Sequence, residues 1–143
     1  MRSEQFSEAW DEFFAAVRRA RGRAAQAHTG GTLTLAQYQL LAAFDREEEL
    51  AVGEVALRGG VATPTATRML SALERDGIVE RHASEVDRRS VLVRLTPGGR
   101  RLLEAKREVV LGKQRAIFES LSAEERAQAV SILNRLAIAM EDL

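Results

Sequence analysis

The chain has 143 residues with 21 basic and 21 acidic side chains, and 45% of it is hydrophobic. These values are typical of one globular domain and exclude a disordered, collagen-like or disulfide-stabilised chain. There is no cysteine, and the two histidines, His28 and His82, are too few ligands for a histidine-based metal centre. We therefore expect neither a metal nor a cofactor. Because no membrane-length apolar run and no signal-peptide core occur, we expect a cytoplasmic protein without membrane contact.

The net charge of zero conceals an uneven distribution of charge. Residues 45–57 hold five acids and one arginine, whereas residues 64–101 hold eight arginines and five acids, a local balance of +3. Phosphate binding requires such a local excess of cations. The basic middle of the chain is therefore a candidate nucleic-acid contact.

The first part of the chain predicts two helices. Apolar residues recur every three or four positions over 4–28, and a Gly-containing break follows at 29–32. Thr34 and Gln37 then have the spacing of a capping box, which predicts a second helix over 34–46. The expected buried residues of the second helix are Leu40, Leu41 and Phe44.

Two further helices are expected before the strands. Residues 53–58 predict a short helix that ends at a Gly-Gly pair. Thr63 followed by Pro64 marks the start of a helix over 64–76, because threonine can accept a hydrogen bond from a first-turn amide and proline suits the first helical position. Gly77 is expected to end this helix.

The next segment predicts a β-hairpin. Residues 78–82 and 90–95 are strand-like, and the second of them alternates apolar residues with the period of a half-buried strand. The polar stretch 83–89 between them predicts a long exposed tip.

Two helices are expected after the hairpin. Thr96 and Pro97 open a long one over 97–119, and a capping box from Ser122 to Glu125 begins another that reaches the C-terminus. The predicted fold is mainly α with a small β-hairpin wing. It comprises a winged helix-turn-helix DNA-binding core at 34–96 within one domain, 1–143, while the apolar helices at 1–30 and 97–143 form a dimerisation region.

The helix over 64–76 has the features of a recognition helix. Its inward positions are apolar, and its outer side carries small hydroxyls and arginines, which suit contacts with base edges and phosphates in the major groove. The alternative is a merely solvated helix face. The inward residues are Ala66, Met69, Leu70 and Leu73, and the outer ones are Thr65, Arg68, Ala72 and Arg75, with Thr67 near the border.

The tip of the hairpin provides a second, independent signal. An arginine at Arg88 or Arg89 could enter a narrow minor groove. Asp87 would hold its neighbour in place through a charge-assisted hydrogen bond. The alternative is a solvated loop, but the spacing from the preceding helix favours contact with DNA.

Five stretches together resemble the MarR family of bacterial transcriptional regulators in order and spacing. They are EVA (54–56), TPTATR (63–68), LERDGIVER (73–81), DRRSVLVRLT (87–96) and LSAEER (121–126). The resemblance implies a dimer of winged helix-turn-helix subunits that represses transcription until a small ligand binds. Val52 departs from the family, which often has a capping threonine or serine there. The expected DNA contacts are Thr63, Pro64, Thr65, Thr67, Arg68, Arg75, Arg81, Asp87, Arg88, Arg89 and Arg94.

A homodimer on double-stranded DNA and a ligand pocket complete the expectation. The pocket would lie where the first two helices and the helix from 97 meet the core, and without cysteine its effector would be non-covalent. Its candidate lining is Trp10, Phe14, His28, Tyr38 and Gln39, each of which has packing or capping as the alternative role. The candidate dimer contacts are Phe6, Trp10, Phe13, Val17, Ile117, Leu121, Leu133, Leu136 and Met140.

Other functional classes fit the sequence less well. His82, Asp87 and Ser90 have the residue types of a hydrolase triad, but they lie on an exposed hairpin without an oxyanion loop, so we expect no enzyme. A winged helix that binds protein, or a constitutive DNA-binding protein without an effector, remains the alternative.

Overall fold

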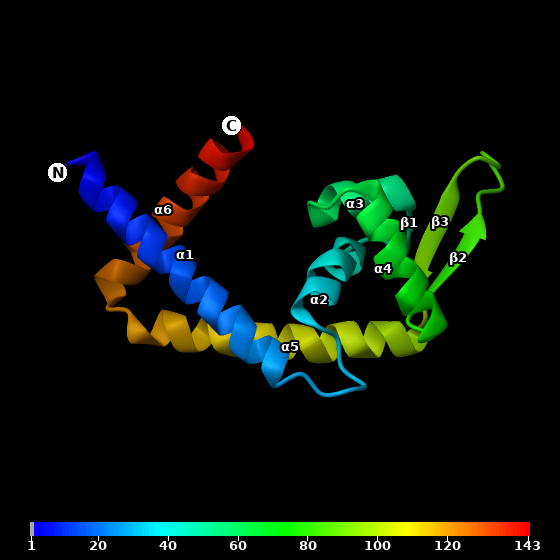
Figure 1. Ribbon diagram of the computed structural model, residues 1–143, viewed down its shortest axis with the longest axis horizontal. Coiled ribbons are helices and arrows are strands. Elements are labelled where there is room, and N and C mark those ends of the chain that lie inside the picture. Colours follow the sequence, from blue (N-terminus) through cyan, green and yellow to red (C-terminus); the bar gives the residue numbers. More distant parts are fainter. Residues whose placement is uncertain (1) are drawn as a thin grey trace. The chain divides into compact units, whose positions relative to one another are not determined.

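The computed structural model describes residues 2–143, which form helices and one small antiparallel sheet (Figure 1). By their internal contacts they divide into two compact units, one up to Lys106 and one from Arg107 to Leu143. None of the helices in residues 2–143 is long and apolar enough to cross a membrane. The elements are α1 (Ser3–Gln26), α2 (Leu35–Leu41), the 3-10 turn η1 (Ala42–Asp45), β1 (Glu49–Ala51), α3 (Val52–Gly59), α4 (Thr63–Arg75), β2 (Val79–Ala83), β3 (Val91–Leu95), α5 (Pro97–Ser120) and α6 (Ala123–Glu141).

The core of the first unit is entirely apolar. Every buried residue in the described part of that unit is a hydrophobic one or a glycine. The predicted inner sides of α2 and α4 are confirmed, except that Met69 is only partly buried and packs against the edge of the core. The largest fully buried side chains are Phe44, Leu33, Leu40, Leu41, Leu70, Leu73, Leu103, Val55, Val79 and Val93.

Most of the predicted helix caps are confirmed. Thr34 and Ser122 each begin a helix with a complete capping box, and Thr96 Oγ1 accepts a hydrogen bond from the amide of Gly99 at 2.9 Å. The prediction that Thr63 caps α4 is wrong. The N-cap is Ala62, which makes no side-chain cap, and Thr63 is the first helical residue.

The sheet contains a strand that we did not expect. β1 pairs with β3, so the strand order is β1-β3-β2 and the hairpin is joined to the residues just before α3. Glu49, in the acidic stretch 45–57, is the first residue of β1 and lies opposite Arg94. α3 begins directly after β1, at Val52, without a side-chain cap. The N-cap is Ala51, one residue before the position at which the family often carries threonine or serine.

The second unit contains the end of α5 and all of α6. Arg126 of α6 donates from Nε to the Phe118 carbonyl at 2.9 Å, and its guanidinium lies 4.4 Å from the centre of the Phe118 ring. These contacts, together with the Ser122 capping box, fix the turn between the two helices.

With its mainly helical chain, its helix pair α3–α4 and its β2–β3 hairpin, the molecule has the predicted winged helix-turn-helix fold (Figure 1).

Candidate nucleic-acid interface

The outer side of α4 is a polar and basic surface. Ala66, Leu70 and Leu73 have no exposed surface, and this burial turns the opposite side of the helix to solvent. Thr65 differs from the prediction in being partly buried. The predicted contact residues of α4 that are exposed are Thr63, Pro64, Thr67, Arg68 and Arg75.

The hairpin carries the second group of predicted residues. Asp87, Arg88 and Arg89 are all exposed in the loop between β2 and β3. The Asp87 carboxylate accepts hydrogen bonds from the backbone amide of Arg89 at 3.0 Å and from the Ser90 hydroxyl at 3.2 Å. The predicted bond between Asp87 and its neighbour is therefore confirmed, and because it is made to the backbone it leaves the Arg89 guanidinium available.

A groove connects α4 with the hairpin. Its volume is about 450 Å³, and it brings together Thr67, Arg81 and Arg89, which were all predicted from the sequence. Sequence reasoning missed the other walls of the groove, which are the junction of β1 and α3 at 51–53 and residues 90 and 91, where β3 begins. The wall at 51–53 could have been predicted only by recognising the β1 strand that leads into α3. A strand of three residues is too short to show a recognisable hydrophobic pattern.

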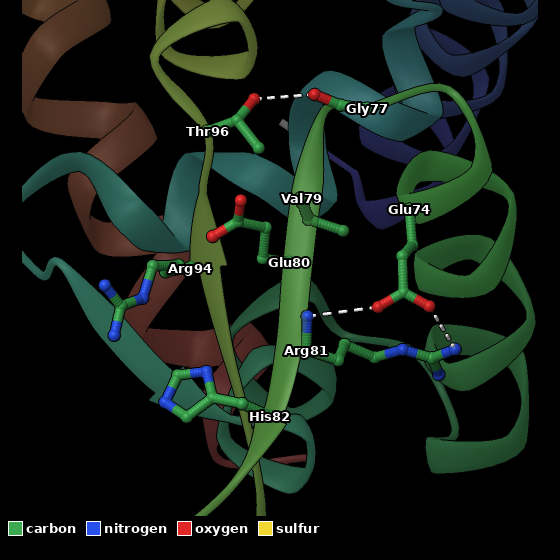
Figure 2. A pocket seen from close by; sticks show the side chains of 8 residues that line it. All are labelled: Glu74, Gly77, Val79, Glu80, Arg81, His82, Arg94 and Thr96. Atoms are coloured by element: carbon green, nitrogen blue, oxygen red, sulfur yellow. Dashed lines mark hydrogen bonds and ion pairs between the residues drawn. The ribbon is translucent and has the colours of Figure 1, made fainter.

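Arg81 is held by an acid of α4. Its guanidinium lies 3.1 Å from Glu74 Oε1, and its backbone amide donates to Glu74 Oε2 at 3.1 Å (Figure 2). The hydrogen bond from the Arg81 side chain, supported by the backbone bond and the charge, holds the pKa of Glu74 below its ordinary value against a smaller effect of desolvation. Arg81 therefore lines the groove as one member of an ion pair.

Arg94 lies near the base of the hairpin. Its guanidinium is 3.3 Å from Glu49 Oε1, and the same carboxylate oxygen is 2.5 Å from Nε2 of His82. Figure 2 shows Arg94 and His82 on the opposite side of β2 from Arg81 and Glu74, around a hollow of about 650 Å³. Arg94 is thus paired within the sheet and lies away from the groove. No group of three potential metal ligands occurs among residues 2–143.

A separate pocket of about 300 Å³ lies between α1, α2 and the beginning of α5. Of the predicted ligand contacts, His28 and Gln39 line it, together with the cationic side chains of Arg21 and Lys106. Both cations were missed from the sequence, although Arg21 lies one helical turn before Ala24 on the same side of α1. The remaining lining residues are Ala24, Ala25, Thr34, Leu35 and Ala36.

The other three predicted ligand contacts are outside this pocket. Tyr38 is partly buried and packs against the core. Trp10 and Phe14 stack on α1 with ring centres 4.8 Å apart, and Phe6 extends the stack at 5.7 Å from Trp10. The aromatic spacing of α1 therefore reflects a helix surface rather than the lining of this pocket.

The predicted dimer contacts are largely exposed in the single chain. Of those in α1, Phe6, Trp10 and Phe13 belong to the group of aromatic rings on the helix, and those from Ile117 onward lie in the second unit. The exposed ones are Phe6, Phe13, Ile117, Leu133 and Met140, and the half-buried ones are Trp10, Val17, Leu121 and Leu136.

The helix pair α3–α4, the basic outer side of α4 and the exposed arginines of the hairpin define a winged helix-turn-helix protein of the DNA-binding class. A family model described as MarR family matches residues 32–90, from the segment before α2 to the end of the hairpin loop. The chain belongs to the MarR family.

Individual relatives agree with this assignment. The chain is 31% identical over 110 residues to an uncharacterised HTH-type transcriptional regulator of Bacillus subtilis, YfiV, and the match covers 77% of this chain and 69% of YfiV. It is 34% identical over 98 residues to the HTH-type transcriptional repressor YetL of the same organism, covering 68% of this chain and 59% of YetL.

Among solved structures, a mutant of E. coli MarR in complex with operator DNA has a TM-score of 0.73 and 26% identity, covering 88% of this chain and 91% of that one. The protein is thus a DNA-binding transcriptional regulator of the MarR type, a family of regulators rather than enzymes.

Proposed function

We propose that the protein is a homodimeric repressor that binds a pseudo-palindromic operator and is released from it by a small, non-covalent anion. The observation that carries the proposal is the groove in which Thr67 of α4 meets Arg81 and Arg89 of the hairpin. A helix with outward hydroxyls and arginines beside a basic loop matches what major-groove and minor-groove readout require.

Each element has a distinct task in this proposal. Thr67 and Arg68 lie on the exposed side of α4, where a hydroxyl and a guanidinium can reach base edges. Arg88 and Arg89 enter the adjacent minor groove, and Arg81 reaches a phosphate only by exchanging its bond with Glu74. Two copies related by a dyad would place their α4 helices about 34 Å apart, in successive major grooves.

The exposed apolar side chains support a second copy as the partner. In the single chain, Phe6 and Phe13 of α1 are 54% and 58% exposed, and Ile117 and Leu133 of the second unit are 66% and 60% exposed. Large apolar side chains gathered on helices in this way favour burial against another protein surface. The YetL relative, named as a repressor, supports the direction of regulation.

The pocket between α1, α2 and α5 suits the effector. Its mainly apolar walls are accompanied by Arg21 and Lys106, with His28 also in the lining, so it favours a compact apolar molecule that carries a carboxylate or a similar anion. The ligand can release DNA only if it binds the DNA-free arrangement of the dimer more tightly than the DNA-bound one.

Selection of bound duplexes from a random library tests the operator, and variants of two arginines test the groove. Arg89→Ala should weaken binding to the selected duplex about tenfold and reduce the slope of log K against log salt by about 1 per subunit bound, because one phosphate-seeking cation is removed. Arg46→Ala, an exposed arginine outside the groove, is the control and should leave the slope unchanged.

Two results would count against the proposal. Selected duplexes without inverted symmetry would refute the dimeric readout. A chain that prefers no duplex over any other would favour a winged helix that binds protein.

A further inference from the structure

The tip of the hairpin is organised by its own hydrogen bonds. The Ser84 amide donates to the Ser90 carbonyl at 2.9 Å, and the Ser90 amide donates to the Asp87 carbonyl at 3.0 Å. Inside this closed loop, Ser84 Oγ accepts hydrogen bonds from the amides of Val86 and Asp87, both at 3.2 Å. One hydroxyl thus binds the two residues that immediately precede the arginines.

The side chains that leave this loop have no partner in the protein. Among residues 2–143, neither Arg88 nor Arg89 makes a side-chain hydrogen bond or an ion pair, and Val86 is 98% exposed. Packing therefore does not hold the loop. Its shape depends on the two backbone hydrogen bonds that close it and on the two short polar side chains within it, Ser84 and Asp87.

We infer that Ser84 is a positioning residue for DNA recognition: its hydroxyl folds the loop in the free protein so that Arg88 and Arg89 are already directed toward the minor groove. The inference rests on the proposed role of the hairpin in the operator complex. An exposed loop that becomes ordered only on DNA loses conformational entropy at that moment, whereas a loop folded beforehand has already lost it.

The chemistry at this position is specific to a hydroxyl. Alanine would leave the amides of Val86 and Asp87 to water, which is tolerated at an exposed tip, so the domain should still fold. Threonine keeps the accepting oxygen. A substitution of Ser84 therefore tests the positioning of the loop without preventing folding and without removing a charge.

The test compares Ser84→Ala, Ser84→Thr and the wild-type chain. In the free protein, ¹⁵N relaxation should show order parameters for the amides of Val86 and Asp87 near about 0.85 in the wild type and about 0.6 or lower in Ser84→Ala. Affinity for the duplex selected by the wild-type chain should fall about tenfold in Ser84→Ala, as expected for two lost hydrogen bonds, with an unchanged salt slope. Ser84→Thr should restore both values.

Equal loop order in Ser84→Ala and wild type would overturn the inference, as would equal affinity. A reduced salt slope in Ser84→Ala would also overturn it, because Ser84 would then control a charge contact rather than the order of the loop. If the wild-type chain selects no duplex, the proposed function itself fails. The relaxation comparison uses no DNA, so it still shows whether Ser84 orders the loop, and the two failures can be told apart.

Discussion

Two neighbouring glycines at the start of α5 provide a matched pair of substitutions with opposite expected effects. A Cβ added to Gly98 would meet only side-chain atoms, the nearest at 3.7 and 3.8 Å, which is ordinary van der Waals contact. A Cβ added to Gly99 would lie 2.0 Å from the carbonyl oxygen of Ile78, where real contacts are essentially never shorter than 3.0 Å. Gly99→Ala therefore requires the backbones of α5 and Ile78 to separate by about 1 Å.

The change in the free energy of unfolding can be worked out from the contacts that this separation would disturb. Alanine is favoured over glycine within a helix by about 1 kcal/mol, so Gly98→Ala should raise the free energy of unfolding by up to about that amount. In Gly99→Ala the same gain opposes overpacking, which costs about 1–3 kcal/mol. A second cost is the weakening of two hydrogen bonds of Thr96, from its amide to Ile78 O at 3.0 Å and from its Oγ1 to Gly77 O at 2.6 Å. Each of these bonds contributes about 1 kcal/mol. A net loss of about 2 kcal/mol is expected.

Urea unfolding followed by circular dichroism measures both variants, with the chain concentration held equal because dimerisation would add to the apparent stability. The midpoint should rise for Gly98→Ala and fall for Gly99→Ala. If the two variants move together, or if Gly99→Ala is as stable as the wild type, then α5 does not approach Ile78 as closely as the structure shows.

Two further outcomes are expected. Glu74→Gln should be less stable than the wild type at pH 7, and the difference in stability should vanish as pH falls below the ordinary carboxyl pKa of 4.5. The reason is that the folded-state pKa of Glu74 is lowered. Its contribution to stability is therefore present above the unfolded-state pKa and is lost when the carboxylate is protonated. Urea midpoints between about pH 7 and about pH 3 check this, and a difference that stays constant over the range would contradict it. Arg21→Gln should weaken binding of small aromatic carboxylates at least about tenfold, measured by thermal shift, while the affinity of the ligand-free protein for DNA stays as in the wild type. An equal thermal shift in the variant would place the anion elsewhere.

Local signals in the sequence predicted the helices and their caps well. The capping boxes at Thr34 and Ser122 depend on residues three positions apart, and the core side of α4 depends on a helical period, so both are readable from short stretches. The cap at Thr63 failed because the amide of Ala66 bonds to the carbonyl of Ala62 at 3.0 Å, which brings Thr63 into the helix.

What the sequence could not provide depends on contacts between distant segments. β1 has three residues and exists because Glu49–Ala51 pair with β3, about forty residues further along the chain. No periodicity can develop over so short a strand. The same is true of the cation-lined pocket, in which Arg21 and Lys106 come together only after α1 and the beginning of α5 have folded against α2.

The structure also changes the meaning of the basic middle of the chain. Counting residues gives it a charge of +3, but Arg81 is paired with Glu74 and Arg94 with Glu49. Among residues 2–143, the arginines of the proposed interface without an ion pair are Arg68, Arg75, Arg88 and Arg89. The unpaired cations therefore lie on α4 and at the hairpin tip, the elements proposed to read bases, while the paired ones lie on the strands β2 and β3. Because an unpaired arginine loses no protein contact when it meets a phosphate, this division concentrates the attraction for DNA at the elements that distinguish one sequence from another.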